Sequence, residues 1–176
     1  MLKTIKFSQK DLNKLFEVGV ENAPCICWIE IERNVAVIGD EELCDYNAID
    51  KENVDIFRFI GNASTVIASK GDIEIGIFGN KELCEESLKR VSNKISQILT
   101  SGKMENNDFM YNGNKYGSSV MANVGNDVYW LGIHISNSIN EELIEKICKK
   151  KMHKKPTPMP RHIYVDEILD LFEDYL

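Results

Sequence analysis

A lysine among small residues is the first candidate for chemistry in this sequence. Lys115 follows an Asn-Gly-Asn turn and precedes Gly117 and Ser118, so little side-chain bulk surrounds it. A ligand could approach the backbone there, and the ammonium group could stabilise a phosphate or a developing oxyanion. Asn107 and Asp108 lie on the preceding strand of the same predicted hairpin. The alternative is a lysine that is simply solvated in a turn.

A second candidate is a strand that ends in small residues. Arg58 lies in an alternating apolar strand, and Gly61, Asn62 and Ala63 follow it. Small residues leave backbone N–H groups accessible, and such groups can cradle a phosphate or a carboxylate. Arg58 would add a planar, permanently charged fork. The alternative is a bulge between two strands with an arginine at the surface.

Lysines, cysteines and histidines give weaker signals. Six lysines gather between positions 146 and 155, where a helix C-terminus or an anionic partner would favour them. The five cysteines lack paired metal-ligand spacing, and the close pair Cys25 and Cys27 is expected to pack on one strand face. The three histidines are scattered, so we predict no bound metal.

Length and charge restrict the class of protein. The 176 residues predict one domain, spanning 1–176 without an accessory C-terminal domain. A net charge of −7 argues against a general nucleic-acid binder, because phosphate contacts need surplus Lys and Arg. No apolar run approaches a membrane span, and the N-terminus does not read as a signal peptide. A cytoplasmic protein with reduced thiols is therefore expected.

The apolar patterns predict helices alternating with runs of strands. Helices are expected from Ser8 and over 80–99, 138–150 and 164–176. Strands are expected over 26–31, 35–39, 54–60, 65–68, 73–78, 108–111, 115–122 and 128–136. Turn residues between them favour hairpins, namely Arg33-Asn34, Lys70-Gly71-Asp72, Asn112-Gly113-Asn114 and Gly125-Asn126-Asp127. The predicted class is α+β, with mostly antiparallel sheets and packed helices.

The joint order of these features resembles the catalytic domain of the biotin/lipoate protein ligase superfamily, which is class II synthetase-like. It is most similar to lipoate–protein ligases and octanoyltransferases. In that family a strand ending in glycine, as in 35–39, precedes an Arg-Arg-x-Ser/Thr-Gly-Gly-Gly loop, which 57–63 matches in part. A strand pair and a long helix lead to an Asn-Asp-(strand)-Gly-Lys-Lys-x-x-Gly-Ser pattern. Asn107-Asp108 and 113–118 look like that pattern.

The resemblance implies a chemistry and assigns residues to it. Lipoate or octanoate would attack ATP, with magnesium, to form an acyl-adenylate, and the acyl group would pass to a lysine of a lipoyl-type carrier protein. Lys115 takes the catalytic position. The substrate and adenylate would contact the remaining matched positions: Arg58, Gly61, Asn62, Ala63, Asn107, Asp108, Gly117 and Ser118.

Departures from the family pattern leave alternatives open. Phe57 stands in place of the first arginine, Asn62 and Ala63 in place of glycines, and Asn114 in place of the first lysine. A non-catalytic member that binds a small acid, a nucleotide or a protein partner is one alternative. An ATP-independent octanoyltransferase with Cys148 as nucleophile is another. A third is the acyl-adenylating half of a two-subunit ligase.

Overall fold

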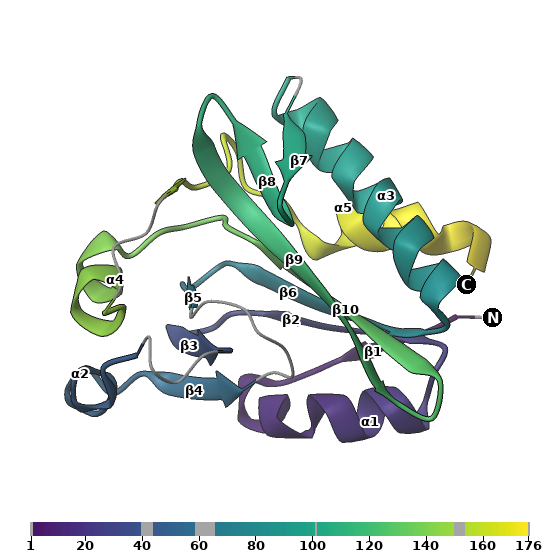
Figure 1. Ribbon diagram of the computed structural model, residues 1–176, viewed down its shortest axis with the longest axis horizontal. Coiled ribbons are helices and arrows are strands. Elements are labelled where there is room, and N and C mark those ends of the chain that lie inside the picture. The colour runs from purple at the N-terminus through teal and green to yellow at the C-terminus, as the bar shows by residue number, and fades with distance from the viewer. Residues whose placement is uncertain (1, 40–43, 59–65, 101, 150–153, 176) are drawn as a thin grey trace.

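The chain folds as two β-sheets with helices packed on them (Figure 1). The computed structural model describes residues 2–39, 44–58, 66–100, 102–149 and 154–175. The larger sheet contains β1 (Lys3–Lys6), β2 (Cys25–Glu30), β6 (Ile73–Gly79), β7 (Lys103–Glu105), β8 (Asp108–Tyr111), β9 (Asn114–Gly125), β10 (Val128–Ile135) and β11 (Lys155–Pro156). The smaller sheet contains β3 (Val35–Ile38), β4 (Asp55–Arg58) and β5 (Val66–Ala68). The helices are η1 (Gln9–Lys14), α1 (Leu15–Glu21), α2 (Tyr46–Lys51), α3 (Lys81–Ile98), α4 (Glu141–Ile147), α5 (Val165–Leu169) and η3 (Asp170–Tyr175), of which η1 and η3 are 3₁₀ helices. The predicted α+β class is confirmed.

The larger sheet is mostly antiparallel, as predicted. Its strand order is β1-β2-β6-β10-β9-β8-β7, and β11 lies beside β9. The pairs β1–β2 and β9–β11 are parallel. The predicted hairpins β8–β9 and β9–β10 are confirmed. Their turns contain Asn112 and Asn126 with φ of 47° and 52°, the left-handed backbone that asparagine tolerates.

Two predicted turns join different sheets instead of making hairpins. The turn at Arg33-Asn34 leads from β2 in the larger sheet to β3 in the smaller one, and the turn at 70–72 leads back from β5 to β6. Gly71 N–H donates to Ile31 O at 2.8 Å, and Ile31 N–H donates to Asp72 O at 2.8 Å. The two segments that cross between the sheets therefore satisfy each other's backbone N–H and C=O groups. These hydrogen bonds take the place of the hairpin pairing that we expected. The smaller sheet can then lie against a face of the larger one.

Helix α3 and the C-terminal helices cover one face of the larger sheet (Figure 1). The Asn80 side chain begins α3 by accepting a hydrogen bond from Leu83 N–H at 2.8 Å. Cys84, Val91 and Ile95 are buried beneath it. The expected C-terminal helix is present as α5 followed by η3, and it packs into the same core. This face is closed by packing.

Helix α1 and the smaller sheet lie against the opposite face (Figure 1). Cys25 and Cys27 are buried there with their sulfur atoms 3.9 Å apart, so the close cysteine pair packs as expected. Phe57 of β4, Phe78 of β6 and Trp130 of β10 belong to the same core. This second core joins the two sheets and borders the site described below.

The helix expected over 138–150 is shorter than predicted. It begins at Glu141, because the side chain of Asn140 accepts from Leu143 N–H at 3.0 Å. Ser138, the first residue of the predicted range, donates its hydroxyl to Lys70 O at 2.6 Å. Its own N–H donates to Asp72 Oδ1 at 2.8 Å. The serine is therefore occupied by the crossing between the sheets and cannot begin the helix.

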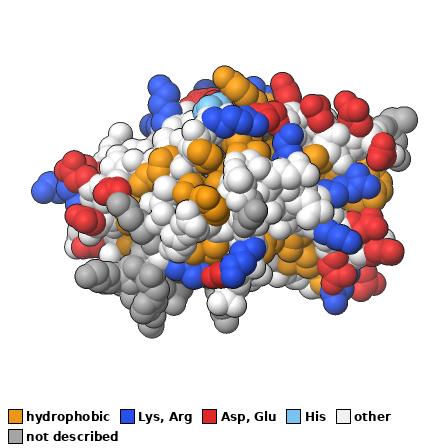
Figure 2. Space-filling model, turned by 90° about the horizontal axis from the view of Figure 1, so that it is seen from above, with side chains coloured by type: hydrophobic (Ala, Val, Ile, Leu, Met, Phe, Trp, Pro, Cys, Tyr) orange, Lys and Arg blue, Asp and Glu red, His pale blue; other side chains and the backbone are white. Residues whose placement is uncertain are grey.

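Charges on the surface are mixed in sign. On the face shown in Figure 2, Lys and Arg side chains lie beside Asp and Glu side chains, and hydrophobic side chains are visible between the two ends. Among the residues that the structure describes, no helix combines the length and apolar character needed to cross a bilayer.

Candidate functional site

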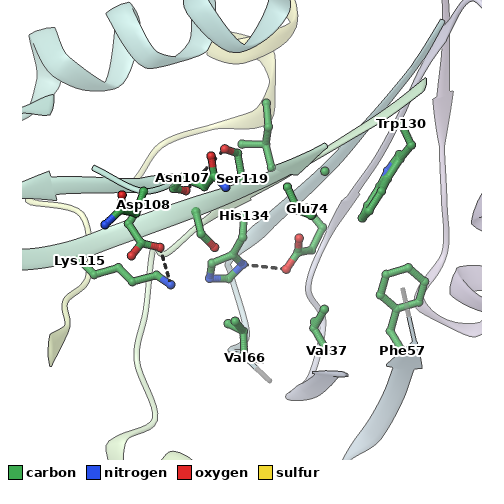
Figure 3. Close-up of a pocket in the computed structure, with 15 residues that line it drawn as sticks. Val37, Phe57, Val66, Glu74, Asn107, Asp108, Lys115, Ser119, Trp130 and His134 are labelled. Carbon is green, nitrogen blue, oxygen red and sulfur yellow. Dashed lines mark hydrogen bonds and ion pairs between the residues drawn. The ribbon is translucent and has the colours of Figure 1, made fainter. Parts of the chain in front are cut away.

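A cavity of about 320 Å³ lies between the two sheets (Figure 3). All three strands of the smaller sheet contribute to its wall, through Val37, Phe57 and Val66. Strands β6, β8, β9 and β10 of the larger sheet supply the rest, together with the β7–β8 turn. Its polar lining residues are Glu74, Asn106, Asn107, Asp108, Lys115, Ser118, Ser119 and His134. Its apolar lining residues are Val37, Phe57, Val66, Val120, Trp130, Gly132 and Ile133. The cavity thus has a polar part and an apolar part.

Lys115 is held at the polar end by a carboxylate. Its Nζ lies 2.8 Å from Asp108 Oδ1, and its side chain is only 12% exposed. The other oxygen of Asp108 lies 2.9 Å from the Nζ of Lys154, which arrives from the C-terminal segment. Two ammonium groups therefore share one carboxylate, which leaves one positive charge that an anion could match. This arrangement suits a carboxylate or phosphate ligand.

The turn before β8 fixes the predicted Asn-Asp pair beside this lysine. Asn106 and Asn107 have φ of 49° and 68°, the left-handed conformations of a tight turn. The carbonyl of Asn107 accepts from Ser119 N–H on β9 at 2.7 Å. The backbone of the turn is therefore bound to the strand that carries Lys115. Both groups belong to one rigid hairpin.

His134 and Glu74 form a second polar pair in the cavity wall, which the sequence reasoning missed. They are register partners on β10 and β6, and His134 Nδ1 lies 2.7 Å from Glu74 Oε1. The other ring nitrogen lies 3.0 Å from Ser136 Oγ and 3.8 Å from Asp72 Oδ2. The sequence does show one sign of this pair, since Glu74 and His134 are polar residues inside otherwise apolar strands. Only the strand register shows that they meet.

Buried charges set the protonation of this pair. Burial alone would lower the pKa of His134, but the charge and hydrogen bond of Glu74 and the charge of Asp72 outweigh it. The pKa of His134 is therefore raised above its usual value. Burial raises the pKa of the Asp72 carboxyl, against the lowering effect of His134.

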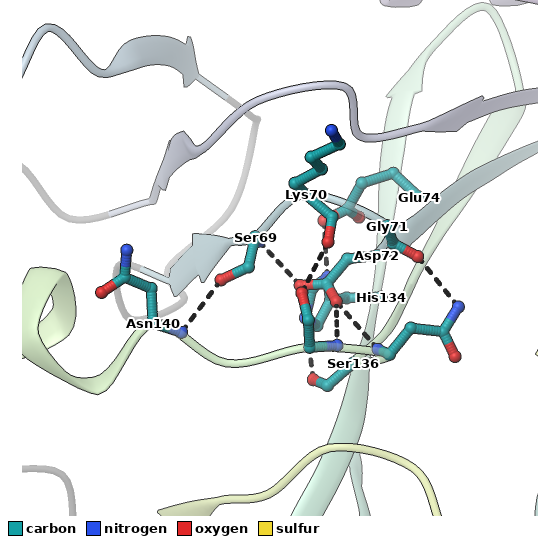
Figure 4. A network of polar contacts seen from close by, with 10 residues as sticks. Ser69, Lys70, Gly71, Asp72, Glu74, His134, Ser136 and Asn140 are labelled. Atoms are coloured by element: carbon teal, nitrogen blue, oxygen red, sulfur yellow. Dashed lines mark hydrogen bonds and ion pairs between the residues drawn. The ribbon is translucent and has the colours of Figure 1, made fainter. Parts of the chain in front are cut away.

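Asp72 is the centre of the polar network behind the cavity (Figure 4). Its carboxylate accepts from the N–H groups of Ser69, Asn137 and Ser138 at 2.7, 2.8 and 2.8 Å. The side chain is fully buried. Asp72 therefore joins the end of the smaller sheet to the segment after β10. Its position indicates a structural role, because its oxygens are already occupied.

The structure brings together several predicted site residues. Lys115, Asn107, Asp108 and Ser118 all line the cavity. Gly117 lies beside them, where a Cβ would be 2.4 Å from His134 O, so close strand packing explains this glycine.

Other predicted residues lie elsewhere. Arg58 is exposed at the end of β4, with its guanidinium 3.4 Å from Tyr46 Oη, and it does not line the cavity. Gly61, Asn62 and Ala63 lie outside the described residues. Their assignment to the substrate stays a prediction.

Cys148 is placed at the end of α4, opposite Cys44 in an isolated β-bridge. It does not line the cavity that contains Lys115. Burial raises the pKa of its thiol to about 11, so the reactive thiolate is disfavoured. The structure offers no support for Cys148 as a nucleophile.

Two lysines of the cluster between 146 and 155 pair with acidic side chains. Lys146 lies 2.9 Å from Glu52 and 2.8 Å from Glu142, and Lys154 pairs with Asp108. Positions 150–153 lie outside the described residues. Within the described ranges, no group of three His, Cys, Asp or Glu side chains is placed to hold a metal ion.

Comparisons with known proteins identify the fold. No protein-family model matches the sequence, and no curated protein matches it. Among solved structures, LipL1 of P. falciparum in complex with lipoate matches with a TM-score of 0.75 and 13% identity, over 97% of this chain and 57% of that one. This chain therefore spans little more than half the length of that relative.

Two further structures match over more of their own length. One belongs to a bi-partite lipoate protein ligase of Thermoplasma acidophilum (TM-score 0.74, 10% identity, 98% of this chain and 82% of that one). The other is lipoate-protein ligase A bound with ATP (TM-score 0.70, 12% identity, 99% and 83%). The chain has the fold of a biotin/lipoate ligase catalytic domain. Biotin protein ligases match this domain at lower TM-scores. The low identities make the chain a divergent example of that fold.

Proposed function

We propose that this domain binds a lipoyl-type carboxylic acid in the cavity between its sheets and acts as a lipoate–protein ligase. The carboxylate lies at Lys115, and the acyl chain extends toward Phe57 and Trp130. The observation that carries the proposal is the cavity itself, which has an ammonium group at one end and an apolar wall at the other, inside a lipoate-ligase fold.

Electrostatics favour this orientation of the acid. The ion pair of Lys115 with Asp108 is shared with Lys154, so the carboxylate of a ligand can approach Lys115 without leaving Asp108 unpaired. The charge of Glu74 is offset by His134, whose raised pKa favours its protonated form. The apolar wall would then bury the chain, which is the main favourable term for such a ligand.

The chemistry would be acyl activation followed by transfer. A carboxylate oxygen of the acid attacks the α-phosphorus of ATP, and pyrophosphate leaves with its bridging oxygen. The Lys115 ammonium stabilises the negative charge on the carboxylate and phosphate during this step. Lys154, which pairs with the other oxygen of Asp108, supplies a second positive charge beside Lys115, and this pair of cations suits a phosphate. Magnesium would enter as the metal of the ATP substrate.

The second half reaction delivers the acyl group. The ε-amine of a carrier-protein lysine attacks the acyl carbonyl, an amide bond forms, and AMP leaves. The Thermoplasma ligase whose structure matches this chain is described together with its E2 lipoyl domain. By analogy, we propose a lipoyl-type carrier as the partner here.

The test is an acylation assay. The protein is incubated with ATP, magnesium, octanoate or lipoate, and an apo lipoyl domain, and the carrier is weighed by mass spectrometry. We expect the mass of one acyl group on the carrier, and its loss with Lys115→Ala. The matched control is Lys103→Ala, because Lys103 is an exposed lysine on β7 that pairs with Glu105 outside the cavity.

Three outcomes would redirect the proposal. Acid binding without an adenylate or a carrier product would indicate the non-catalytic alternative. Transfer from an octanoylated carrier in the absence of ATP would indicate the octanoyltransferase. Activity that appears only when a second chain is added would indicate half of a two-subunit ligase, which the match to a bi-partite ligase favours as the second candidate.

A further inference from the structure

The apolar end of the cavity is closed by one indole ring. Trp130 is 4% exposed and lines the cavity, and its ring lies across Gly76 and Gly132, which are register partners on β6 and β10. A Cβ on Gly132 would lie 2.4 Å from Trp130 Cζ2, and a Cβ on Gly76 would lie 3.0 Å from Nε1. Two facing glycines therefore make the space that the indole fills.

Aromatic side chains hold this ring from the other side. Phe16 of α1 meets Trp130 edge-on, with ring centroids 4.9 Å apart. Phe57, another lining residue, is stacked on Phe16 at 6.1 Å. The indole is thus packed between the sheet and α1, and it separates the cavity from the second core. A ring with neighbours on both sides resists displacement.

We propose that Trp130 sets the length of the acyl chain that this domain accepts. The inference rests on the proposed function and specifies its substrate class as medium-chain carboxylic acids. An acid whose carboxylate lies at Lys115 extends past His134 and Val66, and the end of its chain meets the indole (Figure 3). A longer chain would have to move the ring against Phe16. The cavity, at about 320 Å³, is near the small end of the ~300–1,000 Å³ range of ligand pockets.

Calorimetric titration with saturated acids of increasing length tests this limit. Octanoate, decanoate, dodecanoate and tetradecanoate are compared on the wild type, Trp130→Leu and Trp130→Ala. We expect wild-type affinity to stop rising, or to fall, beyond the medium-chain acids. In both variants affinity should continue to rise, by about fourfold for each further buried methylene. Trp130→Leu keeps apolar bulk against the sheet and replaces the alanine variant if that one does not fold.

A variant that shortens the space for the acyl chain, and a control at the other tryptophan, complete the test. A Cβ in Gly132→Ala would push the indole away from the sheet and shorten the space left for the acyl chain. The affinity of this variant for the longest acid that the wild type binds should therefore fall at least tenfold. Trp28→Leu changes the other tryptophan, which lies on β2 outside the cavity, and should leave the length profile unchanged.

The outcomes separate this inference from the function beneath it. If the wild type binds octanoate through Lys115 but the Trp130 variants keep the wild-type length profile, the inference is overturned and the proposed function stands. If the wild type binds none of the acids, both are overturned. A length limit that moves with Trp130 and not with Trp28 supports the inference.

Discussion

Two charged clusters border the same cavity, and they differ in how far their charges are satisfied. The side chains of Lys115, Asp108 and Lys154 are 12%, 17% and 29% exposed, and together they carry one net positive charge. Asp72 and His134 are 0% and 8% exposed, and protein groups already occupy the oxygens of Asp72 and both ring nitrogens of His134. The cluster of Lys115, Asp108 and Lys154 can receive a ligand, and we call it the open cluster. The cluster of Asp72 and His134 mainly stabilises the junction of the two sheets, and we call it the satisfied cluster.

The difference implies that substitutions in the two clusters should have opposite consequences. Loss of a group from the satisfied cluster leaves buried donors without acceptors, which costs stability. Loss of a group from the open cluster removes a ligand contact, while the remaining members still pair. Stability and activity should therefore separate between them.

The largest effect on stability is expected for Asp72→Ala. Three backbone N–H groups lose their acceptor, and His134 loses a nearby negative charge. We expect the free energy of unfolding to fall by about 3–5 kcal/mol. Urea unfolding followed by circular dichroism measures it. Asp174→Ala, at an aspartate that is 86% exposed, should change it little, and an equal loss in both would contradict the structural role of Asp72.

Lys115→Ala should produce the reverse pattern. Acyl transfer to the carrier should slow by about 10²-fold or more, because one charged donor to the reacting groups is lost. The free energy of unfolding should change by less than about 1 kcal/mol, because Asp108 keeps its pairing with Lys154. Single-turnover acylation and urea unfolding are measured on the same preparation. If Lys115→Ala lost stability but kept its transfer rate, the proposed difference between the two clusters would be contradicted.

His134 should make stability depend on pH. Its pKa is raised in the folded state, so its proton stabilises the fold fully below the usual histidine value of about 6.5. That stability is lost as the pH rises through the raised pKa. The difference in unfolding free energy between the wild type and His134→Asn should therefore shrink with rising pH. Denaturation in buffers from acid to mildly alkaline pH tests this, and a difference that grows would contradict it.

The smallest effect is expected for a surface pair far from the cavity. The Arg161 guanidinium lowers the pKa of Glu167 to about 2, and the two groups lie 2.6 Å apart. Stability from Glu167 is present above its ordinary pKa and is lost as the pH falls through about 2. Because solvent screens this pair, Glu167→Gln should cost less than about 1 kcal/mol at neutral pH. Thermal unfolding at low and neutral pH compares the two forms.

Asp108 and Lys115 of the open cluster could be predicted from the sequence because they are close along the chain, whereas the pairing of Lys154 with Asp108 joins residues 46 positions apart and was not predicted. Asn107, Asp108 and Lys115 lie on one hairpin, so a turn motif was enough to place them together. The satisfied cluster could not be predicted in this way. Glu74 and His134 are 60 residues apart, and their contact depends on the register of β6 with β10.

The fold class was predictable, but the division into two sheets was not. The alternation of apolar and polar residues, together with the turn residues, identified most strands. Neither pattern shows which strands pair where the chain passes from one sheet to the other. The hydrogen bonds between Ile31, Gly71 and Asp72 decide that pairing, and they join segments about 40 residues apart. The apolar end of the cavity was missed for the same reason, since Gly76 and Gly132 meet only in the sheet.

The most direct test of the central claim is head-group selectivity. Octanoate, octanol and octylamine share one chain, and their affinities for the wild type and for Lys115→Met can be compared by calorimetric titration. We predict that the wild type binds octanoate most tightly, and that Lys115→Met loses this preference by about tenfold or more while it still binds octanol. Wild-type protein that binds octylamine as tightly as octanoate would contradict a carboxylate site at Lys115.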